Sequence, residues 1–194
     1  MSSVTLVDLG YGNLGSLETA LRRLGVEVGR ASDPAAIAAA DRLLLPGVGA
    51  AGFAMQRIAA LGLKDALQGF ARPALGICLG MHLLFERSEE GDVDALGLLP
   101  GEVRKLLPRP SVTVPHMGWS RLEVTAKDIG LNDGDYVYFA HSYAAPDGPS
   151  TIARAFHGET VPAVVRSDNW TGAQFHPERS GPAGARFLSA WLTS

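Results

Sequence analysis

Residues 74–85, ALGICLGMHLLF, contain the only cysteine of the chain, Cys78. One glycine lies two residues before it and another two residues after it, in the pattern G-x-C-x-G. The residues before Cys78 are typical of a buried strand, and those after it of a helix. A side chain at so sharp a strand-to-helix turn is held out of the carboxyl edge of a sheet, and glycines relieve the crowding there. The stretch therefore predicts a parallel α/β sheet that carries an accessible thiol.

Strand and helix patterns alternate around this turn in the first half of the chain. Leu14, Leu17, Leu21 and Leu24 form one apolar face of a helix that Gly25 ends. Asp33 can cap a short helix that has a proline at its first position. We expect strands at 4–8, 26–30, 42–46 and 74–78. We expect helices at 14–25 and 79–86, a short helix that begins at residue 34, and helices that run through residues 55 and 67. Such an order predicts a parallel sheet with helices on both faces.

The second half of the chain has a different pattern. Between residues 101 and 174, short β-branched or aromatic runs separated by turns predict further strands, several of them antiparallel. Residues 181–192 predict a closing helix. The predicted fold class is α/β: a three-layer sandwich with a mostly parallel central sheet and additional antiparallel strands in the C-terminal half. A length of 194 residues fits a single domain over 1–194.

Composition narrows the classes of function. The net charge of −3 and the absence of a basic run argue against nucleic acid as a ligand and against a membrane surface. No apolar run approaches the ~20 residues of a membrane span, and no targeting segment is visible, so we expect a cytoplasmic protein. One cysteine cannot form an internal disulfide, and no Cys/His spacing indicates a metal site. No cofactor is expected.

The thiol of Cys78 has candidate partners. N–H groups at the start of the following helix, with that of Leu79 first, can stabilise a thiolate and an oxyanion. A thiolate nucleophile needs a base, and the base needs an orienting group. His176 and Glu178 are two residues apart in FHPERS, so on an extended segment, which Pro177 favours, they point the same way. His82, one helical turn after Cys78, is a rival base. The alternative is a buried cysteine that serves only as a small apolar residue.

Residues 10–15, GYGNLG, match the dinucleotide-binding pattern G-x-G-x-x-G between a strand and a helix. The second strand ends near Arg30 rather than near an acid, which would suit NADP rather than NAD. The Cys78 and His176 segments argue against this interpretation, because a dinucleotide-binding domain does not need them.

Taken together, GICLGMHLLF, FHPERS, PGVGAAGFAM and DLGYGNLGS resemble the class I glutamine amidotransferases. VPHMGWSRL and YFAHSY resemble, within that class, the glutaminase subunits that serve histidine biosynthesis. The resemblance covers essentially the whole chain. It implies a heterodimer with a (β/α)8-barrel cyclase subunit, which receives the ammonia released from glutamine and uses it on phosphoribulosyl aminoimidazole carboxamide ribotide (PRFAR).

The resemblance also implies roles for particular residues. The catalytic triad would be Cys78, His176 and Glu178. The oxyanion and the glutamine would be held by Gly47, Val48, Gly49, Leu79, His82, His141, Ser142 and Tyr143. The partner interface would contain Asn13, His116, Met117, Gly118, Trp119 and Arg179. The chain departs from the family pattern at His82, where Gln is usual, and at Ser120, where Asn is usual.

Two other interpretations stay open at this point. One is a class I glutaminase that serves another acceptor. The other is a non-catalytic nucleotide-binding or regulatory subunit with an inert cysteine.

Overall fold

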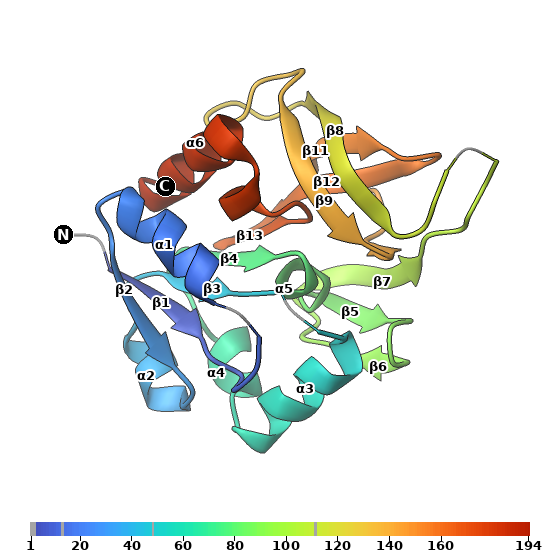
Figure 1. Cartoon of the computed structure of the whole chain (residues 1–194). Helices are drawn as coiled ribbons and strands as arrows, with labels where there is room; N and C mark the ends of the chain where they lie inside the picture. Colours follow the sequence, from blue (N-terminus) through green and yellow to red (C-terminus); the bar gives the residue numbers. More distant parts are fainter. Residues whose placement is uncertain (1–2, 13, 48, 111) are drawn as a thin grey trace.

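The computed structural model describes residues 3–12, 14–47, 49–110 and 112–194 (Figure 1). Nine strands form one sheet in the order β2-β1-β3-β4-β13-β12-β11-β8-β9, and four form a smaller sheet in the order β10-β7-β5-β6. The strands are β1 Ser3–Val7, β2 Glu27–Ala31, β3 Leu43–Leu45, β4 Ala74–Ile77, β5 Phe85–Ser88, β6 Val93–Asp94, β7 Leu99–Lys105, β8 His116–Val124, β9 Tyr136–His141, β10 Tyr143–Ala144, β11 Thr151–Phe156, β12 Thr160–Ser167 and β13 Trp170–Ala173.

Helices cover both faces of the large sheet (Figure 1). They are α1 Gly15–Arg23, α2 Pro34–Ala39, α3 Ala51–Ala60, α4 Lys64–Gln68, α5 Leu79–His82 and α6 Gly181–Leu192, with a 3-10 turn, η1, at Pro177–Arg179. Apolar residues of α2, α3 and α4 share one buried cluster, and those of α1 and α6 share another. The sheet lies between these two layers, so the predicted three-layer α/β fold is confirmed.

The large sheet changes from parallel to antiparallel partway across. Strands β2-β1-β3-β4-β13 are mutually parallel, whereas β13-β12-β11-β8-β9 are antiparallel neighbours. β13 therefore belongs to both halves. Ala173 of β13 pairs with Ile77 of β4, so the residues that follow these two strands emerge side by side at one edge.

Most predicted elements lie where the sequence placed them. Asp33 caps α2 by accepting a hydrogen bond from the Ala36 N–H at 2.9 Å. The closing helix has the predicted bounds. The helix predicted over 79–86 is too long. In the structure α5 ends at His82, and Phe85 begins β5, which pairs with β7. A partner strand distant in sequence overrides the local pattern.

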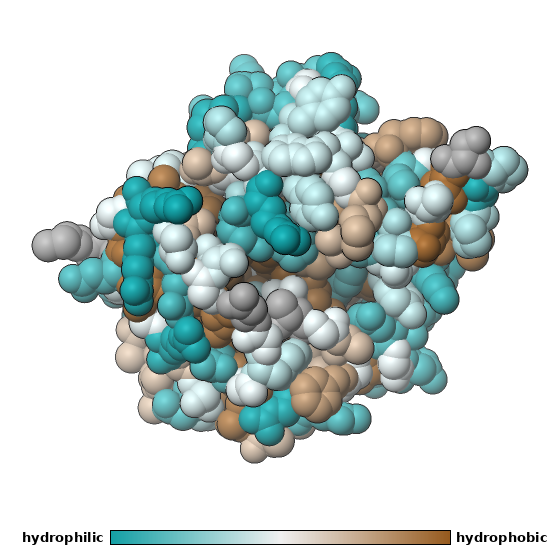
Figure 2. Space-filling view, viewed as in Figure 1, coloured by the Kyte–Doolittle hydropathy of each residue, from teal (hydrophilic) through white to brown (hydrophobic). Residues whose placement is uncertain are grey.

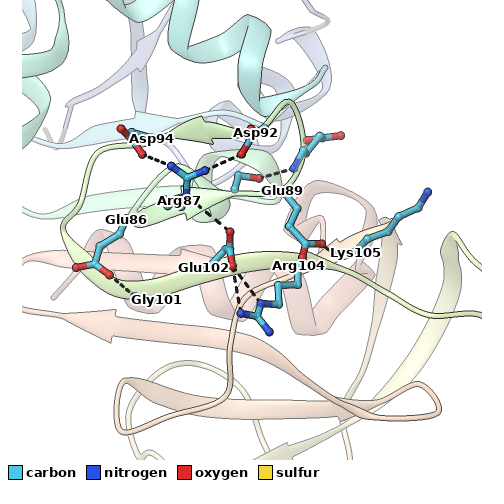
Figure 3. Close-up of polar contacts among 11 residues, drawn as sticks. Glu86, Arg87, Glu89, Asp92, Asp94, Gly101, Glu102, Arg104 and Lys105 are labelled. Carbon is cyan, nitrogen blue, oxygen red and sulfur yellow. Dashed lines mark hydrogen bonds and ion pairs between the residues drawn. The ribbon is translucent and has the colours of Figure 1, made fainter.

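Charged side chains tie the small sheet together (Figure 3). Arg87 of β5 lies 2.6 Å from Asp92, 2.7 Å from Asp94 and 3.7 Å from Glu102 of β7. Glu86 of β5 accepts a hydrogen bond from the Gly101 N–H at 2.9 Å. Exposed ion pairs contribute little one by one, but this network links three short strands.

No helix in the described part of the chain is long and apolar enough to cross a membrane.

Candidate active site

Cys78 occupies a strained turn between β4 and α5. Its φ of 51° and ψ of −108° lie outside the regions that L residues prefer. Its N–H donates to the Ala173 carbonyl oxygen at 2.6 Å, which continues the pairing of β4 with β13. Strain of this kind at a residue other than glycine is typical of functional sites.

The glycines around Cys78 allow three backbone segments to touch. A Cβ added to Gly76 would lie 2.5 Å from the Gly80 carbonyl oxygen. One added to Gly80 would overlap the Leu45 carbonyl oxygen at the end of β3. One added to Gly47 would overlap the Ile77 carbonyl oxygen and the Leu79 nitrogen. The G-x-C-x-G pattern is therefore a packing requirement of the turn as well as a motif.

The loop after β3 lies directly against the start of α5. The Cα of Gly47 approaches the Leu79 N–H closely, which is where the sequence predicted an oxyanion site. α5 has only four residues, so a helix dipole contributes little here and the first N–H groups are the candidate donors. Gly49 has a φ of +86° and lines the cavity beside Cys78. Val48 lies outside the described residues.

His176 and Glu178 form the pair that their spacing predicted. The Nδ1 of His176 lies 2.9 Å from the Oε1 of Glu178, and both side chains are largely buried. Burial alone would lower the pKa of His176, but hydrogen bonds to Cys78 and Glu178, with the charges of both, raise the pKa to about 10. His176 is therefore protonated at neutral pH and faces Cys78 as an imidazolium.

The backbone around this pair differs from the prediction in one respect. His176 is extended as expected, but Pro177 begins the 3-10 turn η1 instead of continuing the extended segment. Proline fits this position because it has no N–H to satisfy at the first residue of a helical turn. The turn brings the Glu178 carboxylate back onto His176.

Ser180 fixes this turn against β9, and the sequence gave no signal for it. Its hydroxyl donates to the His176 carbonyl oxygen at 2.7 Å and accepts from the Tyr138 N–H at 2.9 Å. The His176 N–H donates to the Tyr138 carbonyl oxygen at 2.9 Å. Ser180 is buried, so these bonds are shielded from water.

A cavity of about 330 Å³ opens beside Cys78. It brings together the predicted substrate residues Gly49, Leu79, His82, His141, Ser142 and Tyr143. The predicted residue Gly47 lies behind the cavity wall, against Leu79. Pro115, Met117, Ala140 and Glu90 complete the lining.

Glu90 is the lining residue that sequence reasoning missed. Its carboxylate accepts a hydrogen bond from the Ala51 N–H at 3.0 Å and so caps α3. It is the only acidic residue among those that line the cavity. Nothing in the sequence separates it from neighbouring Glu89, because only the turn between β5 and β6 directs one of them toward Cys78.

His82 is buried and makes a different contact from the one expected of a rival base. Its Nε2 lies 2.7 Å from the Oε1 of Gln174. Burial, only partly offset by the hydrogen bond to Gln174, lowers the pKa of His82 to about 4. His82 therefore stays neutral over the working pH range.

His116 and His141 form a second buried chain of hydrogen bonds. The Nδ1 of His141 lies 2.8 Å from the Tyr143 carbonyl oxygen, and its Nε2 lies 3.1 Å from the Nδ1 of His116. The Nε2 of His116 lies 2.8 Å from the hydroxyl of Ser120. A carbonyl only accepts, so each imidazole donates through Nδ1 and accepts through Nε2.

The pKa of His116 is lowered to about 4, mainly because the ring is buried and to a smaller extent because of the charge of His157. Its ring stacks on Phe139 at 4.5 Å and on His157 at 3.9 Å, measured between ring centroids. The His116 side chain is buried within the chain, and its place in the partner interface stays a prediction.

Of the other predicted interface residues, Met117 and Trp119 lie exposed on β8, and Arg179 of η1 lies against Tyr138 of β9. Met117 and Trp119 of β8 are 65% and 55% exposed. The Trp119 ring meets Tyr138 edge to face at 6.1 Å, and the guanidinium of Arg179 lies 5.3 Å from the centre of the Tyr138 ring. Gly118, between them, has a φ of 131°. Asn13 lies outside the described residues.

The G-x-G-x-x-G segment lies between the predicted strand and helix, and two arginines beside it, Arg30 and Arg57, are already engaged within the chain. Arg30 pairs with Glu18, and it lies 3.5 Å from Asp8. The approach to Gly10 is filled by the guanidinium of Arg57, since a Cβ there would lie 3.0 Å from it. Nothing here favours a dinucleotide phosphate.

The fold and this site together define an amidotransferase. The family model "Glutamine amidotransferase class-I" matches residues 5–193, and the chain belongs to that family. The relative "Imidazole glycerol phosphate synthase subunit HisH" of Xanthomonas campestris is 50% identical, over 99% of this chain and 98% of its own. The protein of the same description from Xylella fastidiosa is 49% identical over the same shares.

Solved structures resemble the chain in fold. A crystal structure described as a glutamine amidotransferase superposes with a TM-score of 0.75 at 21% identity, covering 98% of this chain and 99% of that one. The PurLQS structure from Thermotoga maritima gives a TM-score of 0.71 at 20% identity, covering 99% and 98%.

Proposed function

We propose that the chain is the glutaminase subunit of an imidazole glycerol phosphate synthase. It hydrolyses the side-chain amide of glutamine and passes the ammonia to a cyclase subunit, within one amidotransferase domain over 1–194 and in the cytoplasm. The observation that carries the proposal is the grouping of Cys78, His176 and Glu178, with a cavity that opens beside Cys78. The identity to the HisH relatives over the full length supports the acceptor.

The reaction begins from a thiolate–imidazolium pair, because the pKa of His176 is raised to about 10 by its partners against the effect of burial. The Sγ of Cys78 attacks the amide carbon of glutamine, and the carbonyl oxygen becomes an oxyanion beside the Leu79 N–H. The imidazolium of His176 gives its proton to the amide nitrogen, the C–N bond breaks, and ammonia leaves. His176, now neutral, takes a proton from water, which attacks the thioester and releases glutamate and the thiolate.

The cavity has groups that can bind both the α-ammonium group and the side-chain amide of glutamine. Glutamine carries an α-ammonium group as well as the amide that reacts. Glu90 supplies a carboxylate in the cavity, where it is positioned by the N–H of Ala51. We assign the α-ammonium group to Glu90, and the amide end to the space between Cys78 and Leu79.

The partner is a (β/α)8-barrel cyclase, with which the chain forms a heterodimer. Ammonia must reach it without escaping, so the cyclase binds the face next to Cys78. Met117, Trp119 and Arg179 lie on that side of the β8–β9 ladder. Figure 2 shows hydrophilic and hydrophobic residues interspersed over the side of the molecule that faces the viewer.

Substitution of Cys78 tests the function. Cys78→Ala should abolish glutamate release but leave synthesis from added ammonium salt intact, because only the thiol produces the nitrogen. The assay uses the variant assembled with its cyclase and compares glutamine with ammonium as nitrogen source. Met81→Leu, a buried change on the same helix, is the control and should keep both activities. Glutamate release by Cys78→Ala would remove Cys78 as the nucleophile.

A further inference from the structure

A buried amide connects His82 to the thiol. Gln174 follows β13 and is fully buried. Its Oε1 lies 2.7 Å from the Nε2 of His82, and its Nε2 lies 3.8 Å from the Sγ of Cys78. The backbone holds it from the other side, since the Gln174 N–H donates to the Ala163 carbonyl oxygen at 2.9 Å. One side chain therefore contacts both the residue that departs from the family pattern and the proposed nucleophile.

We propose that His82 is a positioning residue, which fixes the Gln174 amide so that its NH2 group donates a hydrogen bond to the Cys78 thiolate. An amide oxygen only accepts hydrogen bonds, so the Nε2 of His82 must carry the proton. The NH2 group of Gln174 is then left to face the sulfur. A hydrogen bond to an ionised acceptor is stronger than one to a neutral acceptor, so this orientation favours thiolate over thiol.

The opposite arrangement explains why the orientation matters. If His82 carried its proton on Nδ1, its Nε2 could only accept, and the Gln174 NH2 group would turn toward it. The amide oxygen would then face the sulfur, which suits a thiol but repels a thiolate. The tautomer of His82 and the ionisation of Cys78 are therefore coupled through one amide.

His82 performs this role as a neutral residue. Its burial lowers the pKa to about 4, so one ring proton is present throughout the working range. His176 contacts the thiolate from the other side, and the other described titratable groups on the cavity wall are His141, Tyr143 and Glu90. Because these groups remain in every variant below, differences between variants report on the link from His82 through Gln174 to Cys78.

The single cysteine makes a direct test possible. The rate of alkylation of Cys78 by iodoacetamide is measured against pH, because the thiolate is the species that reacts. In His82→Met, which keeps an apolar side chain of similar length but cannot donate, the midpoint of the rate profile should rise by about one pH unit. In His82→Gln, whose amide can donate to Gln174, the profile should match that of the wild type.

Two further variants complete the test. Met81→Leu is buried on the same helix but contacts Gly172, so it controls for repacking and should leave the profile unchanged. Gln174→Glu is nearly isosteric and places a carboxylate oxygen against the sulfur, so its midpoint should rise further than that of His82→Met. If His82→Met does not fold, an unchanged midpoint in Gln174→Glu overturns the proposal, because the Gln174 amide then does not donate to the thiolate.

The proposal is overturned if the rate profile of His82→Met superposes on that of the wild type. It is also overturned if the midpoint rises in His82→Gln as much as it does in His82→Met. The proposal rests on the proposed function, since it assumes that the thiolate is the nucleophile. The alkylation rate needs no glutamine, so failure of the hydrolysis assay and failure of this inference are distinguishable.

Discussion

At the scale of single residues, the charge on His176 depends on its two partners. Its pKa is raised to about 10 because hydrogen bonds to Cys78 and Glu178 and their charges outweigh the effect of burial. A raised pKa means that the proton is held below about pH 10 and lost as the pH passes that value. His176 can therefore act as the acid that protonates the leaving nitrogen at any pH near neutrality.

Glu178→Gln removes one of these two partners. The pKa of His176 should fall toward its ordinary value, so the alkaline loss of kcat/KM for glutamine should begin at lower pH than in the wild type. At neutral pH we expect kcat/KM to fall between about 10²- and 10⁴-fold, the usual range for disturbed acid–base catalysis. That is a smaller loss than removal of the nucleophile causes.

The measurement is kcat/KM for glutamine from about pH 6 to about pH 11, with the cyclase present, so that the range extends beyond the wild-type pKa of about 10. Glu27→Gln, an exposed carboxylate on β2, is the matched control and should follow the wild-type curve. An alkaline limb that does not move in Glu178→Gln would show that Glu178 does not govern the protonation of His176.

The sequence could predict Cys78, His176 and Glu178 because each lies in a local pattern. It could not predict Ser180 or Gln174, since their roles depend on β9 and β13 lying beside the turn. It also could not predict the stacking that buries the His116 side chain. The burial of that ring arises from stacking on Phe139 and His157, and His157 is distant in sequence.

At the scale of elements, close backbone packing shapes the turn that carries Cys78. Gly80 of α5 touches the carbonyl oxygen of Leu45 at the end of β3. Gly80→Ala would therefore force β3 and α5 apart, and overpacking of this kind costs about 1–3 kcal/mol. We expect the free energy of unfolding to fall by about 2 kcal/mol, measured by urea denaturation.

Gly29→Ala is the matched control for that prediction. Gly29 lies on β2, its φ is ordinary, and a Cβ there meets nothing within 4 Å. The same change of residue should therefore leave the free energy of unfolding unchanged or slightly raised, because alanine restricts the unfolded chain. Equal destabilisation by the two substitutions would mean that packing against Leu45 is not the cause.

Elements of the first half were predictable because each has its own local pattern, and α2 has in addition a cap residue, Asp33. The small sheet was not, because its strands are short and are held largely by contacts between segments. Phe85 follows two buried leucines and continues a helical pattern, yet β7 pairs with it as a strand. Arg87 joins β5 to β6 and β7 through carboxylates that no local pattern connects (Figure 3).

At the scale of the whole molecule, the order of the large sheet assembles the site. β13 comes almost a hundred residues after β4 in the chain, yet it lies beside β4 and parallel to it. Cys78 and His176 meet only because of this placement. The sequence predicted both the parallel and the antiparallel strands, but the position of β13 between the two halves follows from their packing.

The face that the cyclase is proposed to bind contains an exposed arginine, Arg179, whose guanidinium lies 5.3 Å from the centre of the Tyr138 ring. Arg72 is a matched residue elsewhere. Its guanidinium lies 5.4 Å from the centre of the Phe70 ring, just before β4 and so at the opposite edge of the sheet from Cys78. The two guanidinium groups share a ring contact but lie at opposite ends of the parallel strands, and that of Arg72 also donates to the Ala38 carbonyl oxygen.

Arg179→Glu should weaken association with the cyclase by about tenfold at low salt, because reversed charges at an interface repel. The loss should shrink at high salt, since the screening length falls from about 30 Å at 0.01 M to about 3 Å at 1 M. Titration of each variant against the cyclase at the two ionic strengths gives the dissociation constants. Arg72→Glu should bind as the wild type does in both. If Arg179→Glu binds the cyclase as tightly as the wild type does at both ionic strengths, Arg179 lies outside the interface. If Arg72→Glu binds more weakly than Arg179→Glu, the cyclase occupies the opposite end of the parallel strands.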